Sequence, residues 1–395
     1  MENKKTKPFY NSTIPSDWEV MEFGEFAEII MGQSPEGNTY NQNGDGVALI
    51  NGPTEFTEKY PVKVQWTSSP TKICKVGDIL LCVRGSSTGR LNIANEEYCI
   101  GRGVAAIRAK KNSSHSFLEF QIESIVNKIL ALTTGSTFPN IDSQSLKRIK
   151  VFLPPLPEQR AIAHILGLMD TAINKNNALI AKKELQKKWL MQNLLTGKKR
   201  IKEFSGEWKE YHLGEMFSER NETRFVDLPL LSVGANGIYP QSDSIKKDTS
   251  NEDKSKYRRI CQGDIGYNTM RMWQGRSALS QLEGIVSPAY TIVTPKGNAD
   301  SLFFSYLFKT PKLTNLFWRN SQGLVDDTLN CKFKDFEIVK VLLPKIKEEQ
   351  TVIAQVLQAA DKEIQLLKTK TEKLREQKKG LMQVLLTGKI RVTIM

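Results

Sequence analysis

Two polar loops carry side chains whose types could read the edges of nucleic-acid bases. The first loop, residues 84–90, follows the apolar stretch 79–83, and the second loop, residues 268–276, occupies the equivalent place later in the chain. Arginine can donate two hydrogen bonds to guanine, and asparagine or glutamine can pair in the same way with adenine. Serine and threonine suit bases or phosphates, and glycines let the backbone approach a ligand closely. The residue types favour DNA contact, although each loop alone could be a hairpin turn with solvated charges.

Shorter polar segments complete the candidate DNA-contacting set. Residues 101–103 precede another apolar stretch, residues 134–140 form a later loop, and residues 320–323 lie near the place of that loop in the second half. Because the loops match in position and differ in residues, as a set they favour two readers of different DNA sequences. The candidates are Arg84, Ser86, Ser87, Thr88, Arg90, Arg102, Thr137, Asn140, Asn268, Arg271, Gln274, Arg276, Asn320 and Gln322.

No arrangement of residues matches a known catalytic motif. The Gly-x-x-x-x-Gly-Lys-[Ser/Thr] phosphate loop, the dinucleotide-binding glycine motif and the Gly-x-Ser-x-Gly elbow are missing. So is the Asn/Asp-Pro-Pro-aromatic tetrapeptide of adenine methyltransferases. The three histidines and five cysteines are widely spaced, which argues against a metal site or a disulfide framework. We therefore expect a chain that is not an enzyme by itself.

The formal net charge of +13 favours a polyanionic partner. Charge alone leaves nucleic acid, an anionic membrane and an acidic protein open. The chain has no run of about 18 apolar residues and no apolar signal segment behind its first residues, so we expect a cytoplasmic protein that does not enter a membrane. Lysine clusters at 182–188 and 368–379 are either a solvated helix face or contacts to phosphates or a partner.

An internal repeat positions the loops. Residues 190–198 return as 381–389 with a shift of 191. The later parts of the two copies match closely, while the earlier parts share only scattered residues, so the sequence predicts two half-molecules, each a globular part followed by a long helix. Shorter matches are Glu158-Gln159 with Glu349-Gln350, Gly77-Asp78-Ile79 with Gly263-Asp264-Ile265, and Gly89-Arg90 with Gly275-Arg276.

Apolar residues in alternating steps of four and three predict that the two helices pair along one face. Pro157 and Glu158 are typical of a first helical turn, and Gly197 and Gly388 of a helix end. Each helix would have roughly 38 residues and a length of about 57 Å. The predicted seam, interrupted by polar residues such as Asn176 and Thr371, comprises Ile162, Leu166, Met169, Ile173, Ile180, Leu190, Leu194, Ile353, Leu357, Ile364, Leu367, Leu374, Leu381 and Leu385.

The globular parts are predicted to be mixed α/β, because short β-like apolar stretches alternate with turn residues. Antiparallel pairing of the helices would place one globular part at each end and create a pseudo-two-fold axis, and we favour it over parallel pairing. The predicted fold class is therefore α/β, with two similar domains separated by a two-helix antiparallel coiled coil. The predicted boundaries are 1–152 and 201–341 for the domains and 153–200 and 342–395 for the helices.

These features resemble the specificity subunits of type I restriction-modification enzymes. The resemblance rests on Leu-Pro-Pro-Leu-Pro-Glu-Gln-Arg at 153–160, the long helix behind it, the Leu-Leu-Thr-Gly-Lys ending, and their return at 342–389. The Gly-Asp-Ile strand start and the Gly-Arg pair look like the family's target-recognition domains. The resemblance covers nearly the whole chain, but the second copy departs at 343–350, which has one extra residue and fewer prolines.

The resemblance implies that each target-recognition domain reads one half of an asymmetric, bipartite site in double-stranded DNA, with the helices setting the unread spacer. Two copies of a methyltransferase subunit would dock on the helices and bring S-adenosylmethionine. Motor-nuclease subunits would bring ATP and Mg²⁺, while this chain, in one copy per complex, would bind no cofactor. The alternatives are a coiled-coil scaffold that binds proteins only, a self-contained nuclease or methyltransferase, and an RNA-binding protein.

Overall fold

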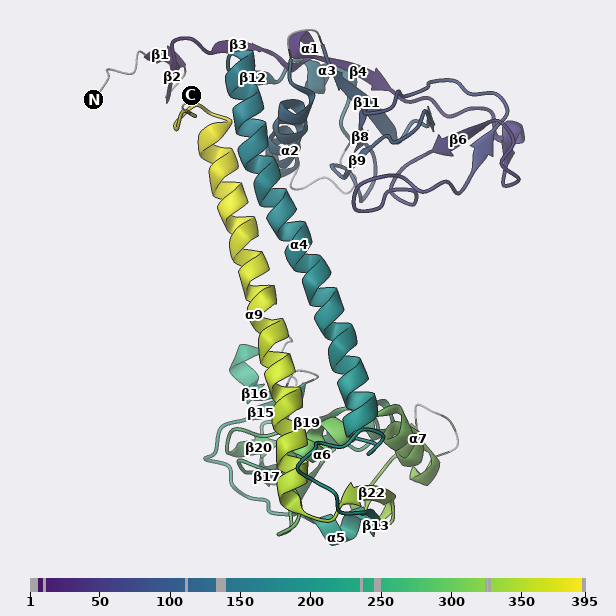
Figure 1. Ribbon diagram of the computed structural model, residues 1–395, viewed down its shortest axis with the longest axis vertical. Helices are drawn as coiled ribbons and strands as arrows, with labels where there is room; N and C mark the ends of the chain where they lie inside the picture. Colours follow the sequence, from purple (N-terminus) through teal and green to yellow (C-terminus); the bar gives the residue numbers. More distant parts are fainter. Residues whose placement is uncertain are drawn as a thin grey trace. The chain divides into compact units, whose positions relative to one another are not determined.

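The structure is a computed structural model that describes residues 6–9, 12–110, 113–132, 140–234, 237–244, 250–323, 325 and 328–392. The chain forms two compact units: unit 1 contains residues 1–176 and 370–395, and unit 2 contains residues 177–369. Each unit holds one globular domain and a part of each long helix, as the colours of Figure 1 allow the reader to follow.

The domain of unit 1 is built on an antiparallel four-stranded sheet of order β4-β11-β8-β9, with helix α2 packed on it. A second four-stranded sheet has the order β10-β6-β7-β5, and β1–β2 and β3–β12 form two-stranded pairs. The elements are β1 Thr6–Phe9, β2 Ser12–Pro15, β3 Glu19–Glu22, α1 Phe23–Phe26, β4 Ala27–Met31, η1 Gly37–Thr39, β5 Tyr40–Asn41, β6 Val47–Ile50, β7 Trp66–Thr67, β8 Ile79–Cys82, β9 Leu91–Ile93, β10 Cys99–Ile100, β11 Val104–Ala109, α2 His115–Leu132, α3 Ser143–Lys147 and β12 Lys150–Leu153.

The domain of unit 2 has an antiparallel sheet of order β14-β21-β18-β19 and three two-stranded pairs, β13–β22, β15–β16 and β17–β20. Its elements are β13 Trp208–His212, α5 Leu213–Met216, β14 Phe217–Glu219, β15 Leu231–Gly234, β16 Gly237–Pro240, η2 Gln241–Asp243, β17 Arg258–Ile260, β18 Ile265–Asn268, η3 Met272–Gln274, β19 Ser277–Leu279, β20 Gly284–Val286, β21 Tyr290–Pro295, α6 Ser301–Leu307, α7 Pro311–Asn320, α8 Phe333–Phe336 and β22 Lys340–Pro344.

The two four-stranded central sheets are copies of one another. Strands β8, β9 and β11 begin 186 residues before β18, β19 and β21, and the strands have the same order in both sheets. The predicted α/β fold class and the internal repeat are thereby confirmed. The domain boundaries placed at 152, 200 and 341 stay predictions.

The repeated Gly-Asp-Ile motif has a structural cause. Gly77 and Gly263 have φ values of 89° and 90°, a left-handed conformation that glycine adopts without a steric penalty. Asp78 is buried and its carboxylate receives Arg108 at 2.8 Å, while the equivalent buried Asp264 receives Arg220 at 2.7 Å. The motif therefore turns the chain into the central sheet and fixes it with a buried, charge-assisted hydrogen bond.

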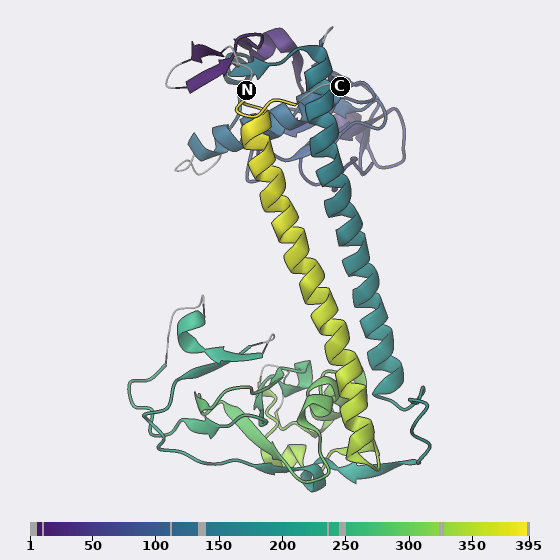
Figure 2. The ribbon, with the colours of Figure 1, turned by 60° about the vertical axis from the view of Figure 1, so that its left-hand side comes forward.

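Two long helices, α4 (Leu156–Leu194) and α9 (Lys347–Leu385), have 39 residues each. In unit 1, Asp170 contacts Lys378 at 2.8 Å and Asn176 contacts Thr371 at 3.4 Å, so residue numbers rise along α4 as they fall along α9. The same order holds within unit 2, where Lys183 contacts Glu363 at 2.7 Å. The helices run antiparallel in each unit, as both ribbon views show (Figures 1 and 2). No helix in the described part of the chain is long and apolar enough to cross a membrane.

Every predicted seam residue is buried or partly buried. At the helix ends, seam residues also belong to the domain cores. Ile162 of α4 and Leu385 of α9 share the core of unit 1, and Leu194 of α4 and Ile353 of α9 share that of unit 2. Each domain therefore folds around the beginning of one long helix and the end of the other.

Candidate nucleic-acid interface

The first loop leaves β8 and exposes only part of its predicted set. Arg84 and Ser86 are exposed at the tip, and Ser87 is partly buried. Thr88 is buried, and its hydroxyl donates to the carbonyl of Gly85 at 2.7 Å. The tip therefore presents Arg84 and Ser86, whereas Thr88 shapes the turn.

Arg90 points back into the domain. Its guanidinium donates to the carbonyl of Pro53 at 3.2 Å and to that of Phe56 at 2.9 Å. These bonds fix the 53–56 segment beside the first loop and occupy donors that a base would need. Arg102 stands exposed in the turn between β10 and β11, where its backbone N–H donates to Ser34 Oγ at 3.2 Å.

A distant segment joins the first loop. Asn140 is exposed and forms an antiparallel β-bridge with Arg84, and the N–H of Ile141 donates to the carbonyl of Val83 at 2.9 Å. The fold thus brings together two segments that the sequence separates by about fifty residues. Thr137 lies outside the described residues.

The second loop contains the short helix η3 and is anchored by Met272, which is buried against α7. Gln274 and Arg276 are exposed, while Arg271 is partly buried. The side-chain oxygen of Asn268 accepts from the N–H of Met270 at 3.0 Å, which makes this asparagine a turn-forming residue.

The structure corrects the partner assigned to the later loop of unit 2. Asn320 is partly buried at the end of α7, where its amide donates to the carbonyl of Leu316 at 2.8 Å. Gln322 is exposed and its amide donates to Asp335 at 3.4 Å. The segment that lies beside the second loop begins at Asn330, because the next N–H, that of Cys331, donates to the carbonyl of Thr269 at 2.8 Å.

Asn330 is therefore the counterpart of Asn140, and the sequence analysis missed it. A shift of 190 residues relates the two, the same shift that relates Trp18 to Trp208, so the sequence held the signal. Asn330 also forms a β-bridge with Gln322. Its side-chain oxygen is buried and has no hydrogen-bond partner within the described part of the chain.

The most closely repeated residues assemble a buried ion pair in each unit. In unit 1, Glu158 is 1% exposed and accepts the indole N–H of Trp18 at 3.0 Å and the guanidinium of Arg391 at 2.6 and 2.7 Å. Arg391 follows the end of α9 and also contacts Asp17 at 2.8 Å. This Trp-Glu-Arg node joins the beginning of α4, the end of α9 and the domain.

Unit 2 repeats the node with equivalent residues. Glu349, 2% exposed, accepts the indole N–H of Trp208 at 3.2 Å and Arg200 at 2.6 and 2.8 Å. Gly197 has a φ of 70°, and a Cβ there would lie 3.2 Å from the Trp208 ring. The repeated glycine is therefore needed both for its conformation and for the close approach of the tryptophan.

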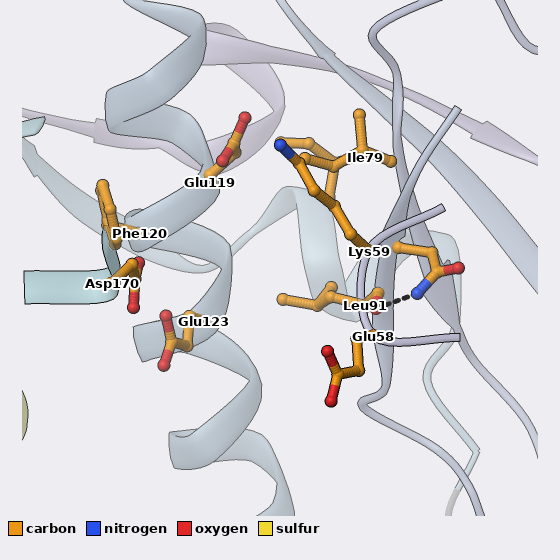
Figure 3. Close-up of a pocket in the computed structure, with 10 residues that line it drawn as sticks. Glu58, Lys59, Ile79, Leu91, Glu119, Phe120, Glu123 and Asp170 are labelled. Carbon is orange, nitrogen blue, oxygen red and sulfur yellow. Dashed lines mark hydrogen bonds between the residues drawn. The ribbon is translucent and has the colours of Figure 1, made fainter. Parts of the chain in front are cut away.

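A second contact between α9 and the unit 1 domain is acidic. Lys378 reaches Asp170 at 2.8 Å and Glu123 at 3.0 Å, and its ammonium lies 5.2 Å from the centre of the Phe120 ring. Burial lowers the pKa of Lys378, but the two carboxylates raise it more, so the net shift is upward. Beside this contact lies a pocket of about 140 Å³ lined by four carboxylates. In Figure 3 three of its acidic side chains come from the helix and the α4 segment on one side of the pocket, and Glu58 and Lys59 come from the other.

The equivalent contact in unit 2 lacks one carboxylate. Lys187 reaches Asp361 at 2.5 Å, its ammonium lies 5.5 Å from the centre of the Tyr306 ring, and the Tyr306 hydroxyl donates to Asp361 at 2.7 Å. A shift of 186 residues places Lys309 where unit 1 has Glu123. Lys187 and Lys183 of the predicted basic cluster thus serve cross-helix ion pairs.

The cysteines have the chemistry of core residues. All five are free thiols. Burial raises the pKa of Cys74 and that of Cys331 to about 12, so both are protonated at neutral pH and poor nucleophiles. Among the described residues, no group of three or more His, Cys, Asp or Glu could hold a metal ion.

Comparison with known proteins gives a single family. The family described as "Type I restriction modification DNA specificity domain" matches residues 15–186 and again 205–376. A Methanocaldococcus jannaschii protein, provisionally named as the MjaX type I restriction enzyme specificity subunit, is 41% identical over 51% of this chain and 48% of its own length. The chain thus spans about half of that relative. The MjaVIII specificity subunit of the same organism is 25% identical over 98% of this chain and 96% of its own length.

A solved structure shares the fold. The crystal structure of the type I restriction-modification system S subunit from M. genitalium matches 98% of this chain and 100% of its own with a TM-score of 0.58, at 16% sequence identity.

Proposed function

Because the chain belongs to the family of type I restriction-modification DNA specificity domains and is a specificity subunit of such a system, we propose that it binds double-stranded DNA and reads one half of a bipartite site with each domain. One observation carries the proposal. The two central sheets are copies, and each sends an exposed loop from the same strand position with different residues at its tip. Arg84 and Ser86 offer one set of donors and acceptors, and Gln274 and Arg276 offer another.

A conserved scaffold with different loop tips suits two half-sites of different sequence. The sheet fixes where the loop stands, and the side chains decide which base edges satisfy it. Asn140 and Asn330 join the candidate contacts, because each lies beside the loop of its own unit.

We further propose that α4 and α9 dock two copies of a methyltransferase subunit, and that this chain enters the complex once. Large apolar side chains stand exposed on these helices, among them Leu168, Leu185 and Leu366. Exposed apolar residues that gather on one element are typical of protein interfaces. In this assembly the chain itself performs no catalysis, and S-adenosylmethionine, ATP and Mg²⁺ belong to the methyltransferase and motor-nuclease partners.

The test is to co-express the chain with its methyltransferase partner and to map methylated adenines in the host genome. We expect a bipartite motif with one methylated adenine on each strand. The variant Arg84→Ala/Ser86→Ala should relax recognition in one half of the motif only, and Gln274→Ala/Arg276→Ala in the other half only.

The matched control is Lys209→Ala, which removes an exposed charge from β13 and should leave the motif unchanged. Loss of discrimination in both halves from either loop variant would contradict the assignment of one half-site to each domain. Absence of any methylation by a well-folded complex would favour a protein-binding scaffold.

A further inference from the structure

A cavity of about 660 Å³ in unit 2 is lined mainly by lysines. Its walls are the end of α4 and the turn that leads into α7. The basic residues that line it are Lys187, Lys188, Lys198, Lys309 and Lys312.

Most of this positive charge is uncompensated. Glu184, the acidic residue of the lining, is paired with Lys368 at 2.7 Å, and Lys187 is paired with Asp361. The other four lysines are exposed and form no ion pair with any residue that the structure describes. Partial desolvation and the neighbouring charge of Lys187 lower the pKa of Lys309. Four unpaired ammonium groups around one hollow are a surface that an anion would stabilise.

The beginning of α7 adds backbone donors to the same cavity. The N-cap is Thr310, whose hydroxyl donates to the carbonyl of Leu307 at 2.7 Å and does not cap the first turn. Pro311 occupies the first turn and Lys312 follows it. The first-turn N–H groups of a helix have no partner within the helix, and they favour negative charge.

The cavity is continuous with the second loop. A Cβ placed on Gly275 would lie 3.5 Å from the Cα of Lys309 and 3.4 Å from Cγ2 of Thr314. Met272 of the same loop shares a core with Leu313 of α7. The turn that carries Lys309 and Lys312 therefore supports the loop that presents Gln274 and Arg276.

We propose that this lysine-lined cavity binds backbone phosphates of the DNA whose bases the second loop contacts. The inference rests on the proposed function and adds to it a phosphate-binding site. Proteins that read base edges make about half or more of their DNA hydrogen bonds to the phosphates and sugars. Lysine binds a phosphate as a point charge, and the uncapped start of α7 can supply N–H groups to the same oxygens. Continuity with the candidate reading loop favours DNA over an acidic protein segment.

The site belongs to one unit only. At the equivalent place unit 1 has Glu123 beside Lys378 and a pocket lined by Glu58, Glu119, Glu123 and Asp170 (Figure 3). Four carboxylates repel phosphate, so the two half-sites should be held by unequal numbers of phosphate contacts.

The experiment measures DNA affinity against salt for the complex with the methyltransferase partner. The variant changes Lys188, Lys198, Lys309 and Lys312 to Gln. For two to four phosphate contacts, the slope of log affinity against log salt should shrink by about 2 to 4, and affinity at roughly 0.1 M salt should fall by about 10- to 1000-fold. The methylated motif should stay the same, because phosphate contacts carry no base information.

Two matched variants guard the interpretation. Changing the exposed residues Lys202, Lys209, Lys340 and Lys345 to Gln removes the same charge elsewhere in unit 2 and should preserve the slope. Changing the four cavity lysines to Arg keeps their charge and should also preserve it. A cavity variant that retains the wild-type slope, or that loses the methyltransferase partner while free DNA binding persists, overturns the inference. Failure of the proposed function differs from both, because the wild-type complex would then show no sequence preference.

Discussion

The two places where a domain meets the long helices have the same centre and different margins. At the centre, Glu158 and Glu349 each hold a tryptophan and an arginine in nearly the same geometry. At the margin, Glu123 of unit 1 is replaced by Lys309 in unit 2, and an acidic pocket by a basic cavity. What the molecule repeats is the joint, and what it varies is the charge presented beside it.

This contrast changes the meaning of the sequence repeat. Close similarity of the helices suggests two copies of one partner, yet the repeated residues also bind the chain to itself within each unit. The exposed apolar residues Leu168, Leu185 and Leu366 have no apolar residue of similar size at their shifted positions, which are Ala359, Glu376 and Lys175. Intrachain packing alone is therefore a sufficient reason for the repeat, and any docked partners meet two dissimilar surfaces.

The largest expected effect comes from breaking the shared node. Arg391→Met should leave Glu158 buried with an uncompensated charge and destabilise unit 1 by about 3 kcal/mol. Arg200→Met should do the same to unit 2, since Glu349 is equally buried. Hydrogen exchange of segments around Trp18 and Trp208 measures the two units separately. Lys389→Met, an exposed neighbour, is the control. A loss in one unit only would end the equivalence.

The next effect comes from exchanging the charges at the margin. Glu123→Lys should destabilise unit 1 by about 1 to 2 kcal/mol, because Lys378 loses one carboxylate and gains a like charge. Lys309→Glu should leave unit 2 at least as stable, because it places a carboxylate near Lys187, while it weakens DNA binding. Urea unfolding followed by unit-specific hydrogen exchange tests both. Equal destabilisation by the two exchanges would show that the margins do not differ in the way described.

A smaller effect is expected in the helix seam. The shift of 191 residues places Leu367 and Ile180 of unit 2 where unit 1 has Asn176 and Thr371. Asn176→Leu combined with Thr371→Ile should be neutral or stabilise unit 1 by about 1 kcal/mol, because both members of a buried polar pair are replaced by apolar groups. Chemical unfolding and light scattering are the measurements. A clear loss of stability, or a new oligomeric state, would assign the polar pair a role in helix register.

The smallest effect is on pH dependence. The pKa of Lys378 is raised above the ordinary lysine value of 10.5, so its contribution to the stability of unit 1 is complete below that value. The contribution is lost as pH rises through the higher pKa of the folded state. The difference in melting temperature between wild type and Lys378→Met should therefore be constant up to about pH 10 and shrink above it. A difference that stays constant above that pH would mean that the ion pairs contribute little.

The sequence by itself determined the features that depend on local geometry. Steps of three and four residues place one face of a helix against its partner, and a left-handed turn requires glycine at Gly77, Gly197 and Gly388 wherever the chain goes next. The same residues, repeated at a nearly fixed shift, predicted two α/β domains and two long helices, and the fold class that followed is confirmed.

The tertiary structure alone decided which candidate side chains are available. Arg84 and Arg90 belong to one loop, but only the strand pairing behind it turns Arg90 toward Pro53 and Phe56. Asn330 reaches the second loop through a contact with Thr269, and Lys309 meets the end of α4 through the packing of α6 and α7. Such contacts join residues far apart in the chain, so they depend on the whole arrangement of strands and helices, which local spacing does not encode.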